Sequence, residues 1–256
     1  MEIDQHKNKF GSQAENYTKY RRPYMSEVYD LLFSLVPEDS KRILDIACGT
    51  GKSTEPLLRS GLAVDGVDID PLMIDEAKGQ AKVKNLDITY AVSEVEHLPY
   101  EDGSFDVVTV GTAFHWFVNE TAMNEIKRVL KKDGLLFVYW TLTTKDVPEE
   151  DAIPAAIFRE FNWEKVPSEL RDLEYISSFF KEQDMQNVST ERLPFTHNDS
   201  VEDQVGLMKT ASSYEVLPEE DKERFIAAIQ AALTEQLGSR PYFIYEEEIQ
   251  VCYGYR

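Results

Sequence analysis

The sequence predicts an α/β fold with a mostly parallel sheet that helices cover on both faces. Stretches with strand-like and helix-like patterns alternate between residues 42 and 140. Most of the strand-like stretches are apolar throughout, which is typical of parallel strands buried on both faces. Hydrophobic residues make up 42% of the 256 residues, so the chain has ample apolar material for a core.

The alternating part resolves into short strands and amphipathic helices. Strands are expected at Arg42–Ala47, Ala63–Ile69, Asp87–Val92, Phe105–Val110 and Leu135–Trp140. Helices are expected at Ser26–Val36, Lys52–Arg59, Leu72–Lys78 and Asn119–Lys131. Pro71 precedes the third helix, where proline suits the first turn. The last of these helices is expected to end at the turn formed by residues 132–134.

The pattern changes after about Thr144. Helical segments are expected at 149–161, 168–183, 201–213 and 218–237, and strands at 188–195 and 242–255. The helices between the last two strands are the natural candidate for a lid. We therefore divide the chain into an N-terminal helical cap segment at 1–40, a ligand-binding core at 41–145, and a lid with the final strands at 146–256.

The charge argues against a polyanionic partner. The 47 acidic and 27 basic residues give a net charge of −20, and no basic run offsets it. Nucleic acid is therefore not expected as the main partner, although a small local patch for tRNA stays open. Cys48 and Cys252 form neither a disulfide framework nor a zinc motif. We therefore expect no metal. No apolar run resembles a signal peptide or a membrane span, so we also expect no membrane association and a cytoplasmic location.

The stretch DIACGTGKST, residues 45–54, is the main candidate for a ligand-binding loop. A triphosphate P-loop would need glycine at position 46, and Ile46 stands there. The dinucleotide pattern fits better, with Gly49 and Gly51 in place and Thr54 at the third glycine position. Asp68, 19 positions after Gly49, suits a ribose hydroxyl pair. An adenosine-bearing ligand is therefore expected over the carboxyl ends of the first two strands.

Asp45 favours one class of adenosine ligand. This acid ends the first strand, four residues before Gly49. A carboxylate is unfavourable beside a pyrophosphate but favourable beside an amino group and a positive sulfur. The loop therefore fits S-adenosylmethionine better than a dinucleotide.

Several motifs in order then resemble one enzyme family. They are LDIACGTG, GVDIDPLMIDEAK, SEVEHLPYEDGSFDVV, GTAFHWF and RVLKKDGLLFVYW, within roughly Phe10 to Trp140. The chain resembles the class I S-adenosylmethionine-dependent methyltransferases, nearest the small-molecule branch with trans-aconitate methyltransferase and the quinone-biosynthesis C-methyltransferases. The resemblance implies a Rossmann-like, mostly parallel seven-stranded sheet with a C-terminal helical lid insertion. It also implies that residues 41–145 bind S-adenosylmethionine.

The resemblance further implies a set of cofactor-binding residues. Those for the methionine and ribose parts are Asp45, Ala47, Gly49, Gly51 and Asp68, with Tyr17 and Arg21 of the YxxYR motif closing over the methionine end. Those for the adenine are Ile69, Met73, Glu94 and Val95, and Thr112 lies with Ala113 and His115 at the mouth for the methyl group. Two residues depart from the family pattern: Ala47 replaces a glycine, and Glu94 replaces an aspartate.

Each candidate also has a purely structural interpretation. Asp45 can be a cap or a strand-end acid held by hydrogen bonds. Met73 and His115 can be packed core residues. Tyr17 and Arg21 can form a surface cation–π pair.

The expected reaction is an in-line methyl transfer to a small molecule. The protein mainly supplies alignment and a dry site, and a proton acceptor is needed only when a hydroxyl, an amine or a carbon acid is attacked. His115 is the candidate general base, and the acceptor is expected to be a carboxylate or a hydroxyl. Residues 111–114, Gly-Thr-Ala-Phe, differ from the Asp/Asn-Pro-Pro-aromatic motif of enzymes that methylate bases or glutamine amides.

Other functions stay open at this point. They are a protein or RNA methyltransferase that works with a partner subunit, a non-catalytic regulatory protein that binds S-adenosylmethionine, and, more distantly, a dehydrogenase. We expect a monomer or a homodimer.

Overall fold

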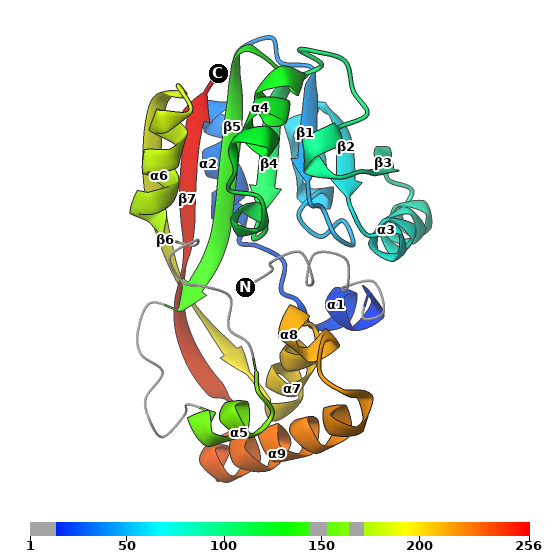
Figure 1. The fold of residues 1–256 in the computed structure, drawn as a ribbon, viewed down its shortest axis with the longest axis vertical. Coiled ribbons are helices and arrows are strands. Elements are labelled where there is room, and N and C mark those ends of the chain that lie inside the picture. The colour runs from blue at the N-terminus through cyan, green and yellow to red at the C-terminus, as the bar shows by residue number, and fades with distance from the viewer. Residues whose placement is uncertain (1–13, 144–152, 164–171) are drawn as a thin grey trace. The chain divides into compact units, whose positions relative to one another are not determined.

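The computed structural model describes residues 14–143, 153–163 and 172–256 (Figure 1). Seven strands form one sheet in the order β3-β2-β1-β4-β5-β7-β6. Their bounds are β1 Arg42–Ile46, β2 Ala63–Asp68, β3 Ile88–Val92, β4 Phe105–Gly111, β5 Leu130–Thr143, β6 Gln186–Asp199 and β7 Phe243–Tyr255. β1 to β5 pair in parallel. The expected mostly parallel seven-stranded sheet is confirmed.

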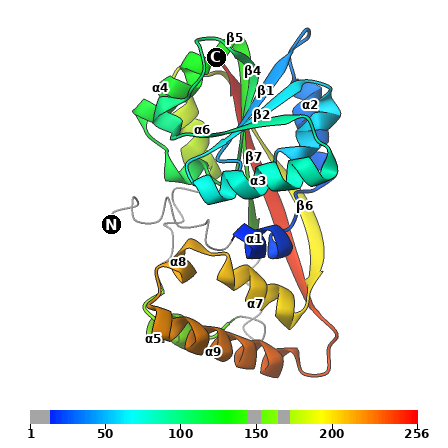
Figure 2. The same cartoon turned by 90° about the vertical axis from the view of Figure 1, so that its right-hand side faces the viewer.

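The helices of the described residues fall into α-helices and short 3₁₀ turns. The α-helices are α1 Ala14–Tyr20, α2 Ser26–Leu35, α3 Pro71–Lys84, α4 Glu120–Val129, α5 Ala155–Glu160, α6 Leu173–Glu182, α7 Val201–Lys209, α8 Ser212–Glu215 and α9 Glu219–Leu237. The 3₁₀ turns are η3 Glu55–Ser60, η4 Val95–His97 and η5 Phe114–Trp116. Figure 2 shows α4 and α6 on one face of the sheet and α2 on the other, as expected for a doubly covered sheet.

The strand order places a switch point at β1. From β1 the chain moves outward to β2 and β3, then crosses back to β4 on the other side of β1. Ligands of open α/β sheets bind at such a point, outside the carboxyl ends of the strands. The strands there are held firmly because Ile43, Leu44, Val107 and Val108 are all fully buried, each worth about 1.5–3 kcal/mol.

Contacts group the chain into two compact units. The sheet unit comprises Pro23–Thr141, Pro167–Leu193 and Ile249–Arg256, and the helical unit comprises Met1–Arg22, Leu142–Val166 and Pro194–Glu248, each over its described residues. In the helical unit Phe225, Ile229 and Leu233 of α9 form the centre of a separate apolar core. Each unit is made of three separate stretches of the chain, so it does not test the continuous division expected from the sequence. The boundaries at residues 40 and 145 stay a prediction. None of the described helices is long and apolar enough to cross a membrane.

The elements differ from the sequence expectations mainly after β1. The helix expected over Lys52–Arg59 is instead a turn followed by the 3₁₀ helix η3. The Gly51 carbonyl accepts from the amides of residues 54 and 55, so a single turn forms here, and the chain continues as a 3₁₀ helix instead of an α-helix. α3 continues to Lys84, where Asn85 ends it in a left-handed conformation. Parts of the helices expected at 149–161 and 168–183 lie outside the described residues.

Candidate functional site

The loop between β1 and η3 has an unusual backbone. Ala47, Gly49 and Gly51 all have positive φ, at 54°, 54° and 83°. The Cys48 amide donates to the Val67 carbonyl at 3.0 Å, which ties the loop to β2. Left-handed residues turn the chain sharply at the carboxyl end of the strand, and this leaves a glycine-rich backbone that a ligand can approach closely.

Position 51 requires a glycine because of the neighbouring side chains as well as because of its positive φ. A Cβ at this position would overlap the hydroxyl of Tyr90 on β3. Gly66 of β2 meets the same side chain, because its Cβ would lie 2.7 Å from the Tyr90 ring. Tyr90, only 8% exposed, therefore packs between the loop and the sheet. Cys48 belongs to the same apolar cluster, so it packs as a small core residue.

Asp45 is fully buried, with no exposed surface. Hydroxyls from Ser53 and Thr54 donate to its Oδ2, each at 2.7 Å, and the Thr109 hydroxyl donates to its Oδ1 at 2.9 Å. Burial raises the pKa of Asp45, and these three hydroxyls oppose the rise. The carboxylate therefore links Ser53 and Thr54 of the loop to Thr109 of β4. This agrees with the interpretation of Asp45 as a strand-end acid held by hydrogen bonds. Its predicted influence on a ligand stays a prediction.

Asp68 is only partly buried and is held by the backbone. The amide of Gly49 donates to its Oδ2 at 2.8 Å, and the amide of Asp70 donates to its Oδ1 at 2.9 Å. Burial raises the pKa of Asp68 to about 6, against the opposing effect of the two amides. Each carboxylate oxygen keeps a further lone pair, so the group can accept two more hydrogen bonds from neighbouring hydroxyls.

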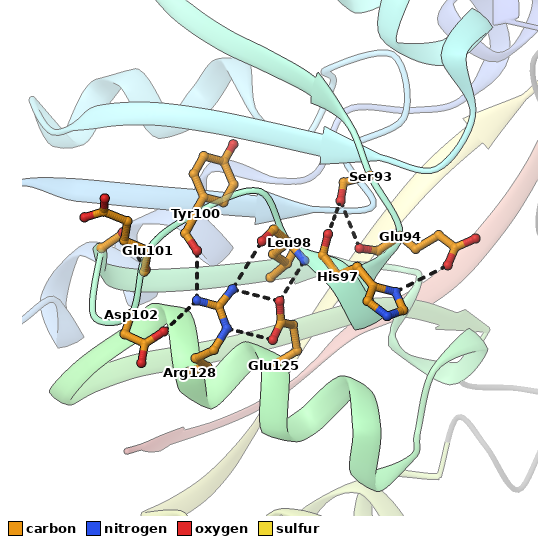
Figure 3. A network of polar contacts seen from close by, with 10 residues as sticks. Ser93, Glu94, His97, Leu98, Tyr100, Glu101, Asp102, Glu125 and Arg128 are labelled. Atoms are coloured by element: carbon orange, nitrogen blue, oxygen red, sulfur yellow. Dashed lines mark hydrogen bonds and ion pairs between the residues drawn. The ribbon is translucent and has the colours of Figure 1, made fainter.

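The segment after β3 lies next to Asp68. The Ser93 amide donates to the Asp68 carbonyl at 2.9 Å, and the Ser93 hydroxyl bridges the carbonyls of Glu94 and His97 (Figure 3). Val95 is buried, whereas the Glu94 side chain is 59% exposed and lies 3.7 Å from His97 Nδ1. The structure therefore places Glu94 and Val95 beside the predicted ribose acid.

An ion pair on α4 holds the continuation of this segment. Arg128 Nε and Nη2 donate to the two carboxylate oxygens of Glu125, each at 2.8 Å. Arg128 also donates to the carbonyls of Leu98 and Tyr100, at 3.2 Å and 2.8 Å, and to Asp102 at 2.7 Å (Figure 3). Hydrogen bonding to Arg128 holds the pKa of Glu125 below its usual range.

The carboxyl end of β4 carries the other part of the site. Thr112 has a φ of 52°, which is unusual for a β-branched residue, and its hydroxyl is hydrogen-bonded to that of Tyr24. Tyr24 packs edge-on against Tyr139 of β5, with ring centroids 4.6 Å apart. A Cβ at Gly111 would lie 3.1–3.2 Å from these two tyrosine hydroxyls. Strained backbone of this kind clusters at functional sites.

His115 lies in η5, directly after this strand end. Its side chain is buried, at 6% exposure, and its ring packs against Trp116 at 4.8 Å. Ala113 is also buried. Met73 on α3 is 2% exposed, as expected for a core residue, and Ile69 is partly buried at the end of β2. The predicted roles of His115, Met73 and Ile69 toward a ligand stay predictions.

Tyr17 and Arg21 belong to the helical unit. The guanidinium of Arg21 lies over the Tyr17 ring at 5.3 Å and donates to the Thr210 hydroxyl at 2.9 Å. The cation–π pair that the sequence allowed is therefore present. Closure over a cofactor stays a prediction for these residues. Within the described part of the chain, no group of three or more acidic, histidine or cysteine side chains is placed to hold a metal ion.

Several residues that build the site were missed by sequence reasoning. They are Tyr24, Ser53, Thr54, Tyr90, Thr109, Glu125, Arg128 and Tyr139. Some of them stand within quoted motifs, such as Thr54 in DIACGTGKST and Arg128 in RVLKKDGLLFVYW. Their partners are distant in the sequence, so the motifs alone gave no signal for the contacts.

Residues 44–138 match a family described as a methyltransferase domain. A methyltransferase-like protein of Schizosaccharomyces pombe, itself uncharacterized, is 28% identical over 246 residues, which are 95% of this chain and 91% of the relative. The ubiquinone biosynthesis O-methyltransferase of Bartonella tribocorum is 39% identical over 106 residues, 41% of this chain and 43% of the relative. Other curated relatives, 36% identical, align over 51% of either chain, so these matches concern the domain rather than the whole protein.

A solved structure supports the fold. A protein of Anaeromyxobacter dehalogenans, provisionally classed as a type II methyltransferase, aligns with a TM-score of 0.69 at 20% identity. The alignment covers 92% of this chain and 98% of that one. At this identity the likeness concerns the fold, which agrees with a Rossmann-like sheet and its helices.

Proposed function

We propose that the chain is a class I S-adenosylmethionine-dependent methyltransferase that methylates a small molecule, and the match of residues 44–138 to a methyltransferase domain supports this proposal. The cofactor, S-adenosylmethionine, would be bound at the carboxyl ends of β1, β2 and β3 and would supply a methyl group on a positively charged sulfur. The remaining work falls to the chain's own residues, which bind, orient and exclude water.

The observation that carries this proposal is the geometry of Asp68 against the loop. Asp68 fixes Gly49 through one oxygen and Asp70 through the other, and each oxygen can still accept a hydroxyl. The two hydroxyls of a ribose match that remaining capacity. Gly51 meanwhile lets the loop pack directly against the Tyr90 hydroxyl, which keeps the turn next to Asp68 in place. The two acceptor oxygens of Asp68 therefore fit an adenosine-bearing cofactor.

An oxygen nucleophile, carboxylate or hydroxyl, is the favoured acceptor class. The relative from Bartonella tribocorum is an O-methyltransferase of ubiquinone biosynthesis, which supports a small acceptor attacked at oxygen. In the proposed transfer, a carbon–oxygen bond would form as the carbon–sulfur bond of the cofactor breaks, and the electron pair would stay on sulfur. His115 would take the proton that a hydroxyl acceptor loses, whereas a carboxylate would need no base.

The acceptor class is tested by labelled methyl transfer. We expect the purified chain to move label from S-adenosylmethionine into the small-molecule fraction of a cell extract, and not into protein or RNA. Label found in protein or RNA alone would contradict the small-molecule proposal.

The base role of His115 is tested separately once a hydroxyl acceptor is identified. We expect His115→Ala to lower kcat by about 100-fold, a usual contribution of general-base catalysis, while S-adenosylhomocysteine binds as before. His115→Gln is the matched variant that keeps a polar side chain. Turnover within about threefold of wild type between pH 6 and 9 would exclude the role.

A further inference from the structure

We propose that Arg128, paired with Glu125 on α4, is a positioning residue for the base-binding side of the cofactor site. This inference rests on the proposed function, because it concerns the same site. Neither Arg128 nor Glu125 is among the residues predicted to contact the cofactor. They act through the backbone of residues 93–102, which follow β3.

The place of this segment follows from the strand register. Val92, the last residue of β3, pairs with Asp68, the last residue of β2. The chain after Val92 is hydrogen-bonded to Asp68 itself, through the Ser93 amide. When Asp68 holds a ribose, the base attached to that ribose extends either over the loop at 47–51 or over the segment at 93–97. The sheet order places β2 between β3 on one side and β1 and β4 on the other, so a ligand whose methyl end faces β4 carries its base on the far side of Asp68, against the segment after β3.

The segment has little regular structure of its own to keep it in place. The 3₁₀ turn η4 spans only Val95–His97, and the Ser93 hydroxyl closes it locally. Beyond His97, a backbone of extended and turn residues leads to β4. A 3₁₀ turn of this length is weak without outside support.

The support comes from α4, and it is bonded to the backbone. Arg128 donates to the Leu98 carbonyl, and Glu125 Oε1 accepts from the Leu98 amide at 2.8 Å. Both polar backbone groups of Leu98 are thus held by one ion pair. Arg128 then donates to the Tyr100 carbonyl, and its own carbonyl accepts from the Gly103 amide at 2.9 Å.

The geometry of the pair suits a positioning role. The Arg128 side chain is 31% exposed and the Glu125 side chain 16%, so both are largely removed from water. Their contact is bidentate, which fixes the plane of the guanidinium. Each N–H of the guanidinium has an acceptor, and lysine cannot reproduce that fork. The Asp102 contact differs, because the Asp102 side chain is 83% exposed and holds no backbone group of the segment.

The test compares Arg128→Lys with Asp102→Asn by calorimetry. Arg128→Lys keeps the charge but loses the fork, and we expect the Kd for S-adenosylhomocysteine to rise about tenfold, the equivalent of one charge-assisted hydrogen bond. The Kd for adenosine should rise by the same factor, because the loss concerns the base. Asp102→Asn should leave both constants within about twofold, as an exposed ion pair contributes little.

Hydrogen exchange gives a readout that does not need a ligand. In Arg128→Lys the Leu98 amide should exchange faster than in wild type, while amides within β4 stay protected. Glu125→Gln keeps an oxygen that can accept from Leu98, so its exchange and Kd should lie between those of wild type and Arg128→Lys.

Three results would overturn the inference. One is an unchanged Kd for Arg128→Lys at a temperature where the variant is folded, even if its Tm is lower, because that marks a structural role. Another is a rise in Kd for Asp102→Asn that equals the rise for Arg128→Lys. The third is a wild type that binds no adenosine ligand at all. If wild type binds NAD instead of S-adenosylhomocysteine, the proposed function fails, and the same variants then test the inference with NAD.

Discussion

The carboxyl ends of β1 and β2 each carry an aspartate, and the two ends differ in how those acids are used. At the β1 end, Asp45 is fully buried, and three side-chain hydroxyls occupy its oxygens. At the β2 end, Asp68 is partly buried, and two backbone amides leave lone pairs open. One acid therefore holds the loop together from within, and the other presents an acceptor to whatever lies on the loop.

Stability and ligand binding are thus expected to depend on two different neighbouring acids. The sequence motif treats both as one signature of an adenosine site. The structure assigns the hydroxyl network to the first and the available acceptor sites to the second. Substitutions at the two positions should consequently change different observables.

Asp45→Ala should produce the largest effect, on stability. It removes the acceptor of three buried hydroxyls, of which Thr109 keeps only a 3.4 Å hydrogen bond to the Leu44 carbonyl, and about 1–3 kcal/mol for each unsatisfied group gives a loss of about 3 kcal/mol or more. For a chain of this size the Tm should fall by about 6–12 °C, measured by thermal or denaturant unfolding. Asp45→Asn keeps one carbonyl oxygen and should lose less. Unchanged stability with lost binding would reverse the comparison.

Asp68→Ala should mainly change binding. Loss of two hydrogen bonds to an ionised acceptor should raise the Kd for S-adenosylhomocysteine by about 100-fold. Calorimetry measures it, and Asp75→Ala, an exposed acid on α3, is the matched control with the same change in charge. If both variants bind alike, Asp68 is not a ligand-contacting acid.

The affinity for the cofactor product and the stability of the fold should depend on pH in opposite directions through Asp68. The pKa of Asp68 is raised to about 6, so its carboxylate is ionised above that pH and accepts hydroxyls fully. As pH falls through 6, affinity for S-adenosylhomocysteine should fall by up to about tenfold for each pH unit. The contribution of Asp68 to folding stability has the opposite pH dependence. Because its pKa is raised, the folded state binds the proton more tightly than the unfolded state, so this contribution is present at low pH and is lost as pH rises through about 6.

Titrations of wild type and Asp68→Asn between pH 5 and 8 test this prediction. The pH dependence of binding should be lost in the variant. A wild-type Kd that is constant across this range would contradict the assignment of the available acceptor to Asp68.

Ala47→Gly should give the smallest effect, with a favourable sign. Ala47 has a φ of 54°, which costs an L-residue about 1–2 kcal/mol, and glycine removes that cost but loses about 0.5–1 kcal/mol through its freer unfolded chain. We expect a net gain of about 0.5–1 kcal/mol in the free energy of unfolding. Gly61→Ala is the reverse control, because Gly61 has a φ of 74° and open space around it. A loss of stability in Ala47→Gly would show that the alanine methyl packs usefully.

Most of the sheet could be predicted because the information is local. β2 and β4 each end within one residue of the expected bounds, since continuous apolar runs and turn residues mark them. The loop glycines and Asp68 were also found locally, from their spacing. The failure at Lys52–Arg59 has a non-local cause. Ser53 and Thr54 turn toward Asp45, eight and nine residues earlier, and no helical pattern reports that.

The rest of the site depends on contacts between distant residues. Tyr24 meets Thr112 across 88 residues, and Arg128 meets the Leu98 carbonyl across 30. Such pairs carry no periodicity and become visible only when the sheet brings the segments together. The helical unit adds a second limit, because its sequence has few motifs that relate residue type to acceptor chemistry.

The most direct test of the account is parallel calorimetry of the wild-type chain with S-adenosylhomocysteine and with NAD. The account predicts saturable binding of S-adenosylhomocysteine with one site per chain, and no measurable heat from NAD under the same conditions. Saturable binding of NAD together with no response to S-adenosylhomocysteine would contradict it.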